Sequence, residues 1–202
     1  MERFAIEASM AKVYGSETSD MVADNCLQIF GGYGFIEEYP VAMAYRDDRI
    51  NRIWEGTNEI NRAIISGYMM KKVLTEEISL RDFLKDLNTF IAADVQANSQ
   101  DNFAIEKHAV QATKKLVVLI FQEALCEFGQ DLKHEQQLSE AFADIFTHIY
   151  TSESVICRVQ QTLSSNGTSN MPVNIAKINV AESLLEVRSL SAKCLNRIFS
   201  EN

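Results

Sequence analysis

The sequence predicts an all-α protein, in which part of a helical-bundle domain (residues 1–72) is followed by an up-and-down helical bundle (residues 73–202). Two observations predict this fold class. The chain has only two prolines among its 202 residues, so few positions interrupt a helix. Apolar residues also recur at steps of three and four along most of the chain, as they do on one face of an α-helix.

The first predicted helix covers residues 1–30. Its apolar positions follow helical spacing and should face inward: Phe4, Ala8, Ala11, Thr18, Met21, Val22 and Ile29. This helix begins without a capping residue, so we expect the chain to open partway through a larger domain, as a fragment or a truncated product. Further along, Pro40–Tyr45 can start a short helix, and Thr57 is a suitable N-cap for a helix from Asn58 to about Lys72.

The second half of the chain contains helical segments separated by polar joins, as in an antiparallel bundle. Ser79 resembles the start of a capping box, and Pro172 suits the first turn of a helix. The predicted segments cover residues 80–91, 103–128, 135–163 and from Pro172 to the end of the chain.

Composition excludes several classes of protein. The net charge of −9 at pH 7, with no cluster of Lys and Arg, argues against a nucleic-acid partner. The N-terminus does not resemble a signal peptide, and no apolar run is long enough to span a bilayer. Four cysteines stand far apart without metal-site spacing, which favours reduced core thiols in an intracellular compartment over disulfides or zinc ligands: Cys26, Cys126, Cys157 and Cys194.

Within residues 28–62, helical spacing stops at Phe30 and resumes after Gly56, but aromatic residues and glycines remain, which indicates a segment held by tertiary contacts. Two interpretations fit the glycines from Gly31 to Gly34: a helix C-cap with a tight turn, or a close approach of the backbone to a ligand. The pattern is not GxGxxG and follows no strand, which excludes a Rossmann or P-loop site. The charged run from Arg46 to Arg52 forms either a solvated face or a buried network that braces the segment.

Glu55 is the candidate for acid–base chemistry on the residues alone. It lies between Trp54 and Gly56, just before a predicted helix N-terminus. A carboxylate held against an indole and away from water would have a raised pKa, suited to a general base, and Gly56 would leave room for a substrate. The alternative is an acid that only interacts favourably with the helix dipole. The three histidines lack metal-ligand spacing, so we expect no metal site.

Two stretches of this segment resemble a known family. They read QIFGGYGF, from Gln28, and YRDDRINRIWEGTNEINR, from Tyr45. Together they resemble the signature of the C-terminal helical domain of the acyl-CoA dehydrogenase family, and the similarity extends from about Ala5 to Lys72. The resemblance implies a flavoprotein of fatty acid β-oxidation that uses FAD to oxidise acyl-CoA thioesters to trans-2-enoyl-CoA.

The resemblance also implies roles for individual residues. Glu55 aligns with the catalytic base that removes the α-proton, while the β-hydrogen leaves as hydride to the flavin. Trp54, which replaces the usual Tyr or Phe, and Gly56 align with substrate-contacting positions. Two groups align with cofactor contacts: Gln28, Ile29, Phe30, Gly31 and Gly32 with the adenosine half of FAD on a neighbouring subunit, and Thr57, Asn58 and Glu59 with the flavin diphosphate.

The second half is similar in helical layout to the additional C-terminal domain of the very-long-chain branch of this family. The nearest local match, EQQLSEAFADIFTHIYTSESVICR, begins at Glu135. In that branch the added domain occupies the place of a second dimer, so the resemblance implies a homodimer. The basic, membrane-associating insertion of the branch has no counterpart near residues 73–102, which argues against membrane association.

The resemblance further implies acyl-CoA as ligand, an electron-transfer flavoprotein as electron acceptor, and a cytoplasmic location, or the mitochondrial matrix in a eukaryote. The family fold needs an N-terminal helical domain and a central β-domain, and this chain has neither, so we expect the isolated chain to be inactive. The alternative, from another class, is a non-catalytic helical module for interaction or dimerisation. An unrelated all-helical regulator would require the composite motif to be a coincidence.

Overall fold

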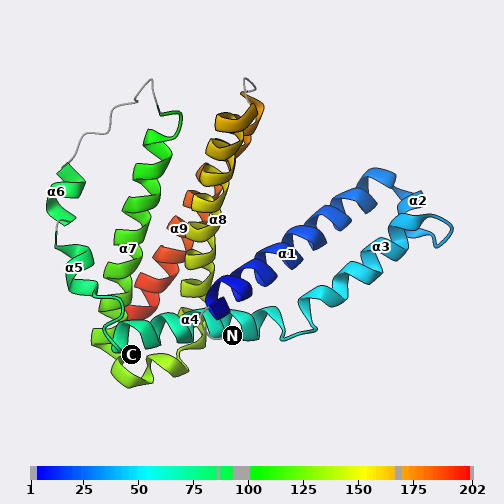
Figure 1. Ribbon diagram of the computed structural model, residues 1–202. Helices are drawn as coiled ribbons and strands as arrows, with labels where there is room; N and C mark the ends of the chain where they lie inside the picture. Colours follow the sequence, from blue (N-terminus) through cyan, green and yellow to red (C-terminus); the bar gives the residue numbers. More distant parts are fainter. Residues whose placement is uncertain (1–3, 86, 93–100, 167–169, 201–202) are drawn as a thin grey trace. The chain divides into compact units, whose positions relative to one another are not determined.

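The computed structural model describes residues 4–85, 87–92, 101–166 and 170–200. Every regular element in these ranges is a helix, so the predicted all-α fold class is confirmed (Figure 1). Within the same ranges, no helix is both long enough and apolar enough to cross a membrane. The chain forms two compact units, Met1–Met69 and Met70–Asn202. Because α4 (Asn58–Leu74) continues through this division, the predicted domain boundary after residue 72 stays a prediction.

Unit 1 is built on one long helix, α1 (Ala5–Phe30), with α3 (Pro40–Arg49) packed alongside it (Figure 1). The short helix α2 (Gly32–Phe35) connects them, and the 3-10 turn η2 (Ile50–Arg52) follows α3. Pro40 stands in the first turn of α3, as its fixed φ favours. The helix continues past the predicted short segment, which places the charged run on a helix rather than in a loop.

The turn after α1 needs glycine at two positions for different reasons. Gly31 has φ +59°, and its N–H donates to the Gln28 carbonyl oxygen at 3.1 Å, so the C-cap interpretation is confirmed. Gly34 packs against the end of α1, where an added Cβ would stand 2.6 Å from the Leu27 carbonyl oxygen. Gly32 has open space around it, so close approach to a ligand stays a prediction there.

The predicted inward face of α1 is wrong: Phe4, Ala8 and Ala11 are exposed, and the residues buried in the first half lie on the opposite face, namely Ile6, Ser9, Met10, Val13 and Ser16. Buried residues of this helix lie between Ile6 and Ser16, whereas Ile29 is 82% exposed and Met21 and Val22 are exposed as well. Helical spacing identifies residues that share a face. It does not identify what packs on that face, and in the described part of the chain the second half of this one is left open to solvent.

Unit 2 is a bundle of three long helices with two short ones beside it (Figure 1). The long helices agree with the predicted segments: α7 (Ala104–Phe128), α8 (Gln136–Asn166) and α9 (Met171–Phe199). The 3-10 turn η3 (Gly129–His134) joins α7 to α8. The core contains apolar side chains from all three, among which Phe121 and Phe142 meet edge to face at 5.1 Å between ring centroids.

The segment predicted at residues 80–91 is two short helices rather than one. Ser79 caps α5 (Leu80–Leu84), since its Oγ accepts the Asp82 N–H at 3.2 Å, and α6 (Leu87–Ala92) begins anew. Helices this short are marginal alone, and each packs separately on α7. The Lys115 ammonium lies over the rings of Phe83 and Phe90, so one α7 side chain contacts both.

The prediction of core thiols is correct for only one cysteine. Cys194 is buried in the bundle, whereas Cys26, Cys126 and Cys157 are exposed, and all four are free thiols. Cysteine is small and only weakly polar, so it is tolerated on either face of a helix. Its position in a helical pattern therefore did not determine its burial.

Candidate active site

The candidate site is the turn between η2 and α4, which contains Trp54, Glu55 and Gly56. Glu55 has φ +55° and Gly56 has φ +82°, so two consecutive residues adopt the left-handed conformation. For glycine this conformation carries no steric penalty, whereas for Glu55 it costs about 1–3 kcal/mol. Such strain persists only where the surroundings enforce it, and it concentrates at functional sites.

Two side chains hold the Gly56 carbonyl oxygen. The Lys12 ammonium of α1 donates to it at 2.8 Å, and the Asn61 amide of α4 donates to it at 2.8 Å. The Asn61 amide also donates to the Thr57 carbonyl oxygen at 3.0 Å. A side chain at position 56 would place its Cβ 3.2 Å from the Asn61 amide nitrogen, so glycine is favoured here by space as well as by φ.

Asn58 connects this turn to α1, and its side chain is only 1% exposed. Its Oδ1 accepts from Lys12 at 2.6 Å, while its Nδ2 donates to Glu17 at 3.0 Å and to the Ser16 hydroxyl at 3.0 Å. An ammonium only donates and a carboxylate only accepts, so these two partners fix the orientation of the amide. The buried amide is therefore satisfied on both sides.

Glu17 completes this network through Arg62. The guanidinium binds the carboxylate with two hydrogen bonds, at 2.8 and 3.0 Å. Partial burial raises the pKa of Glu17, but the hydrogen bonds from Arg62 and Asn58 outweigh that effect, so the pKa lies below its ordinary value. We call Lys12, Ser16, Glu17, Asn58, Asn61 and Arg62 the α1–turn network.

The first turn of α4 has the predicted cap. The Thr57 Oγ1 accepts the Ile60 N–H at 3.3 Å, so Thr57 is confirmed as N-cap. Hydrogen bonds from its own backbone N–H and from the Thr57 hydroxyl lower the pKa of the exposed Glu59 carboxyl. Glu59 is thus an anion at a helix N-terminus, where the dipole favours negative charge.

The expected desolvation of Glu55 is not provided by this chain. Its side chain is exposed, and Trp54 is 57% exposed with its Nε1 donating to Asn51 at 3.1 Å. The indole is thus oriented by η2 rather than buried against the carboxylate. A dry environment for Glu55 would have to come from a ligand or from another part of a larger protein.

The predicted cofactor residues form two separate groups. Thr57, Asn58 and Glu59 adjoin the turn at the level of Lys12 on α1. Gln28, which begins the other group, lies sixteen residues further along the same helix, and that is about 24 Å at the helical rise. Ile29 and Phe30 end α1, and Gly31 and Gly32 follow it. Unit 1 therefore has Thr57, Asn58 and Glu59 at the turn, whereas Gln28–Gly32 lie far from it.

The charged run does not form a lattice of its own within the described residues. Instead it reaches α1: Arg52 pairs with Asp20 at 3.0 Å, and the Ser19 hydroxyl donates to Asp48. Asn51 also donates to Asp48, at 3.2 Å. The run therefore braces the irregular segment through a few specific contacts. This favours the bracing network over a purely solvated face.

Sequence reasoning missed the residues of α1 that hold the turn. They are polar residues of one helix, and the sequence prediction assigned them no contact: Lys12, Ser16, Glu17, Ser19 and Asp20. Steps of three and four residues, from Lys12 to Ser16 to Ser19 and from Glu17 to Asp20, were the available signal. A polar stripe on a helix that also has buried residues can mark a second packed face.

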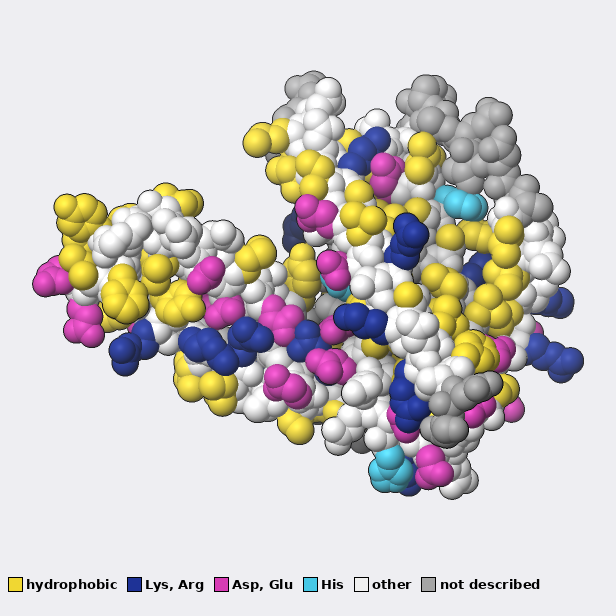
Figure 2. All heavy atoms as spheres, turned by 180° about the vertical axis from the view of Figure 1, so that it is seen from behind, with side chains coloured by type: hydrophobic (Ala, Val, Ile, Leu, Met, Phe, Trp, Pro, Cys, Tyr) yellow, Lys and Arg dark blue, Asp and Glu magenta, His cyan; other side chains and the backbone are white. Residues whose placement is uncertain are grey.

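Unit 1 also has an open groove of about 1130 Å³ between the end of α1 and α3. It is lined by Leu27, Phe35, Ile36, Glu37, Glu38, Ala42, Met43, Tyr45 and Arg46. Figure 2 shows hydrophobic side chains gathered at this end of unit 1, and Phe35 and Met43 are among the exposed ones. The groove contains none of the residues of the turn, so its apolar lining offers a surface rather than a catalytic group.

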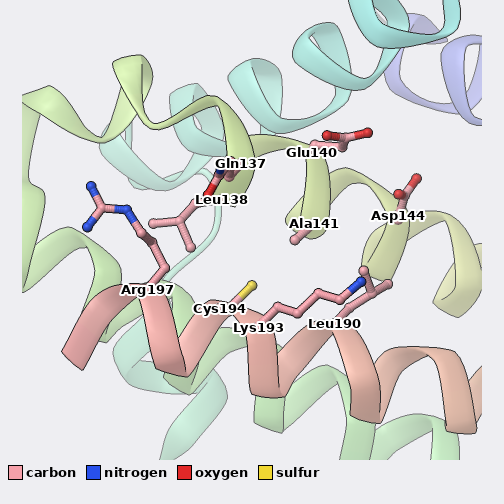
Figure 3. Close-up of a pocket in the computed structure, with 9 residues that line it drawn as sticks. All are labelled: Gln137, Leu138, Glu140, Ala141, Asp144, Leu190, Lys193, Cys194 and Arg197. Atoms are coloured by element: carbon pink, nitrogen blue, oxygen red, sulfur yellow. The ribbon is translucent and has the colours of Figure 1, made fainter. Parts of the chain in front are cut away.

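A second hollow, of about 380 Å³, lies in unit 2 between the start of α8 and the end of α9 (Figure 3). Lys193 and Arg197 border it from α9, and Glu140 and Asp144 border it from α8. Burial raises the pKa of the Cys194 thiol to about 11, so this sulfur is protonated at neutral pH and is not a nucleophile. The described residues contain no group of three or more metal-ligating side chains.

Two family models match separate parts of the chain. Residues 1–70 match the model for the acyl-CoA dehydrogenase C-terminal domain, and residues 112–201 match a second model with the same description. The two matched segments therefore belong to acyl-CoA dehydrogenase C-terminal domain families.

Individual relatives extend over both segments. A probable acyl-CoA dehydrogenase of Bacillus subtilis is 35% identical over 95% of this chain and 33% of its own length. The bovine mitochondrial very long-chain specific acyl-CoA dehydrogenase is 32% identical over 80% of this chain and 28% of its own length. The crystal structure of a Bacillus anthracis acyl-CoA dehydrogenase complexed with FAD superposes with a TM-score of 0.87, at 33% identity, over 98% of this chain and 33% of that one. The chain thus spans about a third of the length of these relatives.

The network makes Asn58 a sensitive position. Asn58→Ala removes a buried amide and leaves Lys12 and Glu17 each without one partner, so we expect a loss of about 2–3 kcal/mol in the free energy of unfolding of unit 1. The measurement is urea denaturation followed by the fluorescence of Trp54, the single tryptophan. Asn25→Ala, at an exposed position of α1, is the matched control and should change stability by less than about 0.5 kcal/mol.

The lowered pKa of Glu17 predicts a pH dependence. Because the pKa is lower in the folded state, ionised Glu17 stabilises unit 1 above the ordinary carboxyl pKa, and this contribution disappears as the pH falls through the folded-state pKa. Glu17→Gln should therefore lower the denaturation midpoint at neutral pH, and its difference from the wild type should shrink in acid. A difference that stayed constant from neutral pH into the acid range would show that the charge of Glu17 is not responsible.

Proposed function

We propose that residues 1–202 are the C-terminal part of a flavin-dependent acyl-CoA dehydrogenase, in which Glu55 is the base that removes the α-proton of an acyl-CoA thioester. The observation that carries this proposal is the conformation of the turn. Glu55 is the one carboxylate of the turn and has a strained backbone, and the α1–turn network binds the carbonyl oxygen of the next residue, Gly56. The matched families and the relatives with FAD-dependent chemistry support the reaction class.

In this function Glu55 accepts a proton directly from carbon. A new O–H bond forms on the carboxylate, the α C–H bond breaks, and its electron pair moves toward the thioester carbonyl. Gly56 leaves space beside the base for the substrate, and the exposed face of Trp54 is available to pack on the thioester. FAD, when bound, supplies the oxidation by accepting the β-hydrogen as hydride, which leaves the trans-2-enoyl product.

The proposed FAD contacts fit the cofactor in part. At Gly31 and Gly32 an added Cβ would meet no atom of this chain within 4 Å, so a ligand ring can approach both backbones. Thr57 and the first turn of α4 offer a helix N-terminus for a diphosphate. The side chain of Asn58 is bound inward and Glu59 is anionic, so these two residues would contribute backbone N–H groups rather than side chains.

A homodimer of the very-long-chain type is the assembly that we propose. Gln28–Gly32 lie about 24 Å from the turn along α1, a separation that favours contacts with two different flavins and hence with a second subunit. The similarity to a very long-chain specific enzyme over 80% of this chain supports the assignment of the added helical domain to residues 73–202. The acceptor, an electron-transfer flavoprotein, and the compartment stay predictions.

The test of the base uses a chimera in which residues 1–202 replace the matched third of the Bacillus subtilis relative. We expect Glu55→Gln to slow flavin reduction by acyl-CoA about 10²- to 10⁴-fold, because an amide cannot accept the α-proton. Glu37→Gln, at another exposed carboxylate of unit 1, is the control and should leave the rate unchanged. Reduction at the parental rate in Glu55→Gln would refute the assignment of the base.

The second candidate function applies to the isolated chain, which would act as a helical interaction module without catalytic activity. This function is favoured by the exposure of Glu55, and the lining of neither hollow includes a residue of the turn. We expect the 202-residue chain to retain no FAD in equilibrium dialysis and to show no flavin absorption, with the chimera as positive control. A chain that retained FAD and was reduced by acyl-CoA would contradict this expectation.

A further inference from the structure

We propose that Lys12 is a positioning residue for Glu55: its ammonium sets the direction of the proposed base by holding the carbonyl oxygen of the next residue, Gly56, without contacting the reacting atoms. The consequence for catalysis rests on the proposed function, whereas the effect on the turn does not. The starting observation is that Lys12 Nζ reaches from α1 to the Gly56 carbonyl oxygen at 2.8 Å, across 44 residues of sequence.

The Gly56 carbonyl has no further capacity once both of its donors are bound. A carbonyl oxygen has two lone pairs, and Lys12 and Asn61 occupy them at 2.8 Å each. Asn61 belongs to α4, the helix that follows the turn directly, whereas Lys12 belongs to α1. Of the two donors, only Lys12 therefore ties the turn to a separate element of unit 1.

The lysine is itself fixed by its second contact. Its Nζ donates to the Asn58 Oδ1 at 2.6 Å, and the other side of that amide donates to Glu17. A flip of the amide would turn its NH₂ group toward the ammonium and its oxygen toward the carboxylate, which both partners oppose. The position of the ammonium is consequently determined from two directions, and a side chain without N–H donors can make neither contact.

This contact bears on Glu55 because the two residues share the strained part of the turn. Glu55 and Gly56 both have positive φ, and for a glutamate the relaxed state is a right-handed or extended conformation. A rotation of the peptides around Gly56 would allow that relaxation and would redirect the carboxylate. Lys12 opposes the rotation through the Gly56 carbonyl, so it acts on the orientation of Glu55 through the backbone.

The first experiment uses the 202-residue chain and its only tryptophan, Trp54, which precedes Glu55. Lys12→Met keeps most of the side-chain length but removes all donors. We expect the local motion of Trp54, measured by fluorescence anisotropy decay and acrylamide quenching, to increase about twofold while far-UV circular dichroism is unchanged. Lys12→Arg retains donors and charge and should restore most of the wild-type signal. Lys85→Met, at an exposed lysine of unit 2, is the matched control and should change nothing.

Two results would overturn the proposal. One is unchanged Trp54 motion in Lys12→Met, and the other is a change that Lys12→Arg fails to reverse. Should Lys12→Met lose helix, Lys12→Leu, which also lacks donors and is a good helix former, takes its place, and the same comparison with Lys12→Arg decides the outcome. Asn61→Ala provides an internal comparison, because it removes the second donor to the Gly56 carbonyl without altering the link to α1.

A second experiment separates this inference from the function on which it rests. In the chimera, we expect Lys12→Met to lower kcat about tenfold with KM little changed, because the base is misdirected while substrate binding is retained. Altered Trp54 motion together with a fully active Glu55→Gln chimera would refute the proposed base and leave the positioning effect intact. An inactive Glu55→Gln chimera together with wild-type kcat and Trp54 motion in Lys12→Met would refute the positioning role alone.

Discussion

The buried amide of Asn58 is the interaction on which the candidate site depends. Asn58 is the first residue of α4, yet its side chain is bound by the Lys12 ammonium and the Glu17 carboxylate of α1. Because a buried amide without partners is costly, these contacts specify one placement of α4's first turn against α1. The turn that carries Glu55 ends at this point, so the same contacts determine where its strained backbone can lie. Local sequence preference alone would not select that conformation.

The charged side chains near this amide fix the positions of their partners more than they stabilise the fold. Lys12 holds the Gly56 carbonyl, Glu17 is held in turn by Arg62, and Arg52 pairs with Asp20 one turn further along α1. Isolated surface ion pairs contribute little, but the Glu17–Arg62 pair shares Glu17 with the buried Asn58 amide and is therefore geometrically restricted. Unit 1 has a modest apolar core in its described part, which makes this polar framework a larger share of what fixes its fold.

The proposed function explains both the exposure of Glu55 and the exposure of the apolar residues at the end of α1. A base that must remove a proton from carbon works best in a dry environment, and an apolar helix face works best when it is covered. The chain spans about a third of the length of its relatives, and in unit 1 both Glu55 and the apolar end of α1 are exposed to solvent. A bound substrate, a flavin and a second subunit would supply what this part of the chain does not.

Helix positions could be predicted from the sequence, because apolar spacing, the Thr57 and Ser79 caps and the two prolines are local signals that tertiary contacts did not override. The candidate site residues from Trp54 to Glu59 could be proposed from the sequence because they form one continuous motif. Tertiary structure alone decided the rest. It showed that Lys12 and Glu17 belong to the site, that Ile29 is exposed, and that Gln28 lies far from the turn. A polar residue on a helix looks the same in sequence whether it meets water or a carbonyl oxygen 44 residues away, so that distinction depends on how the chain folds back on itself.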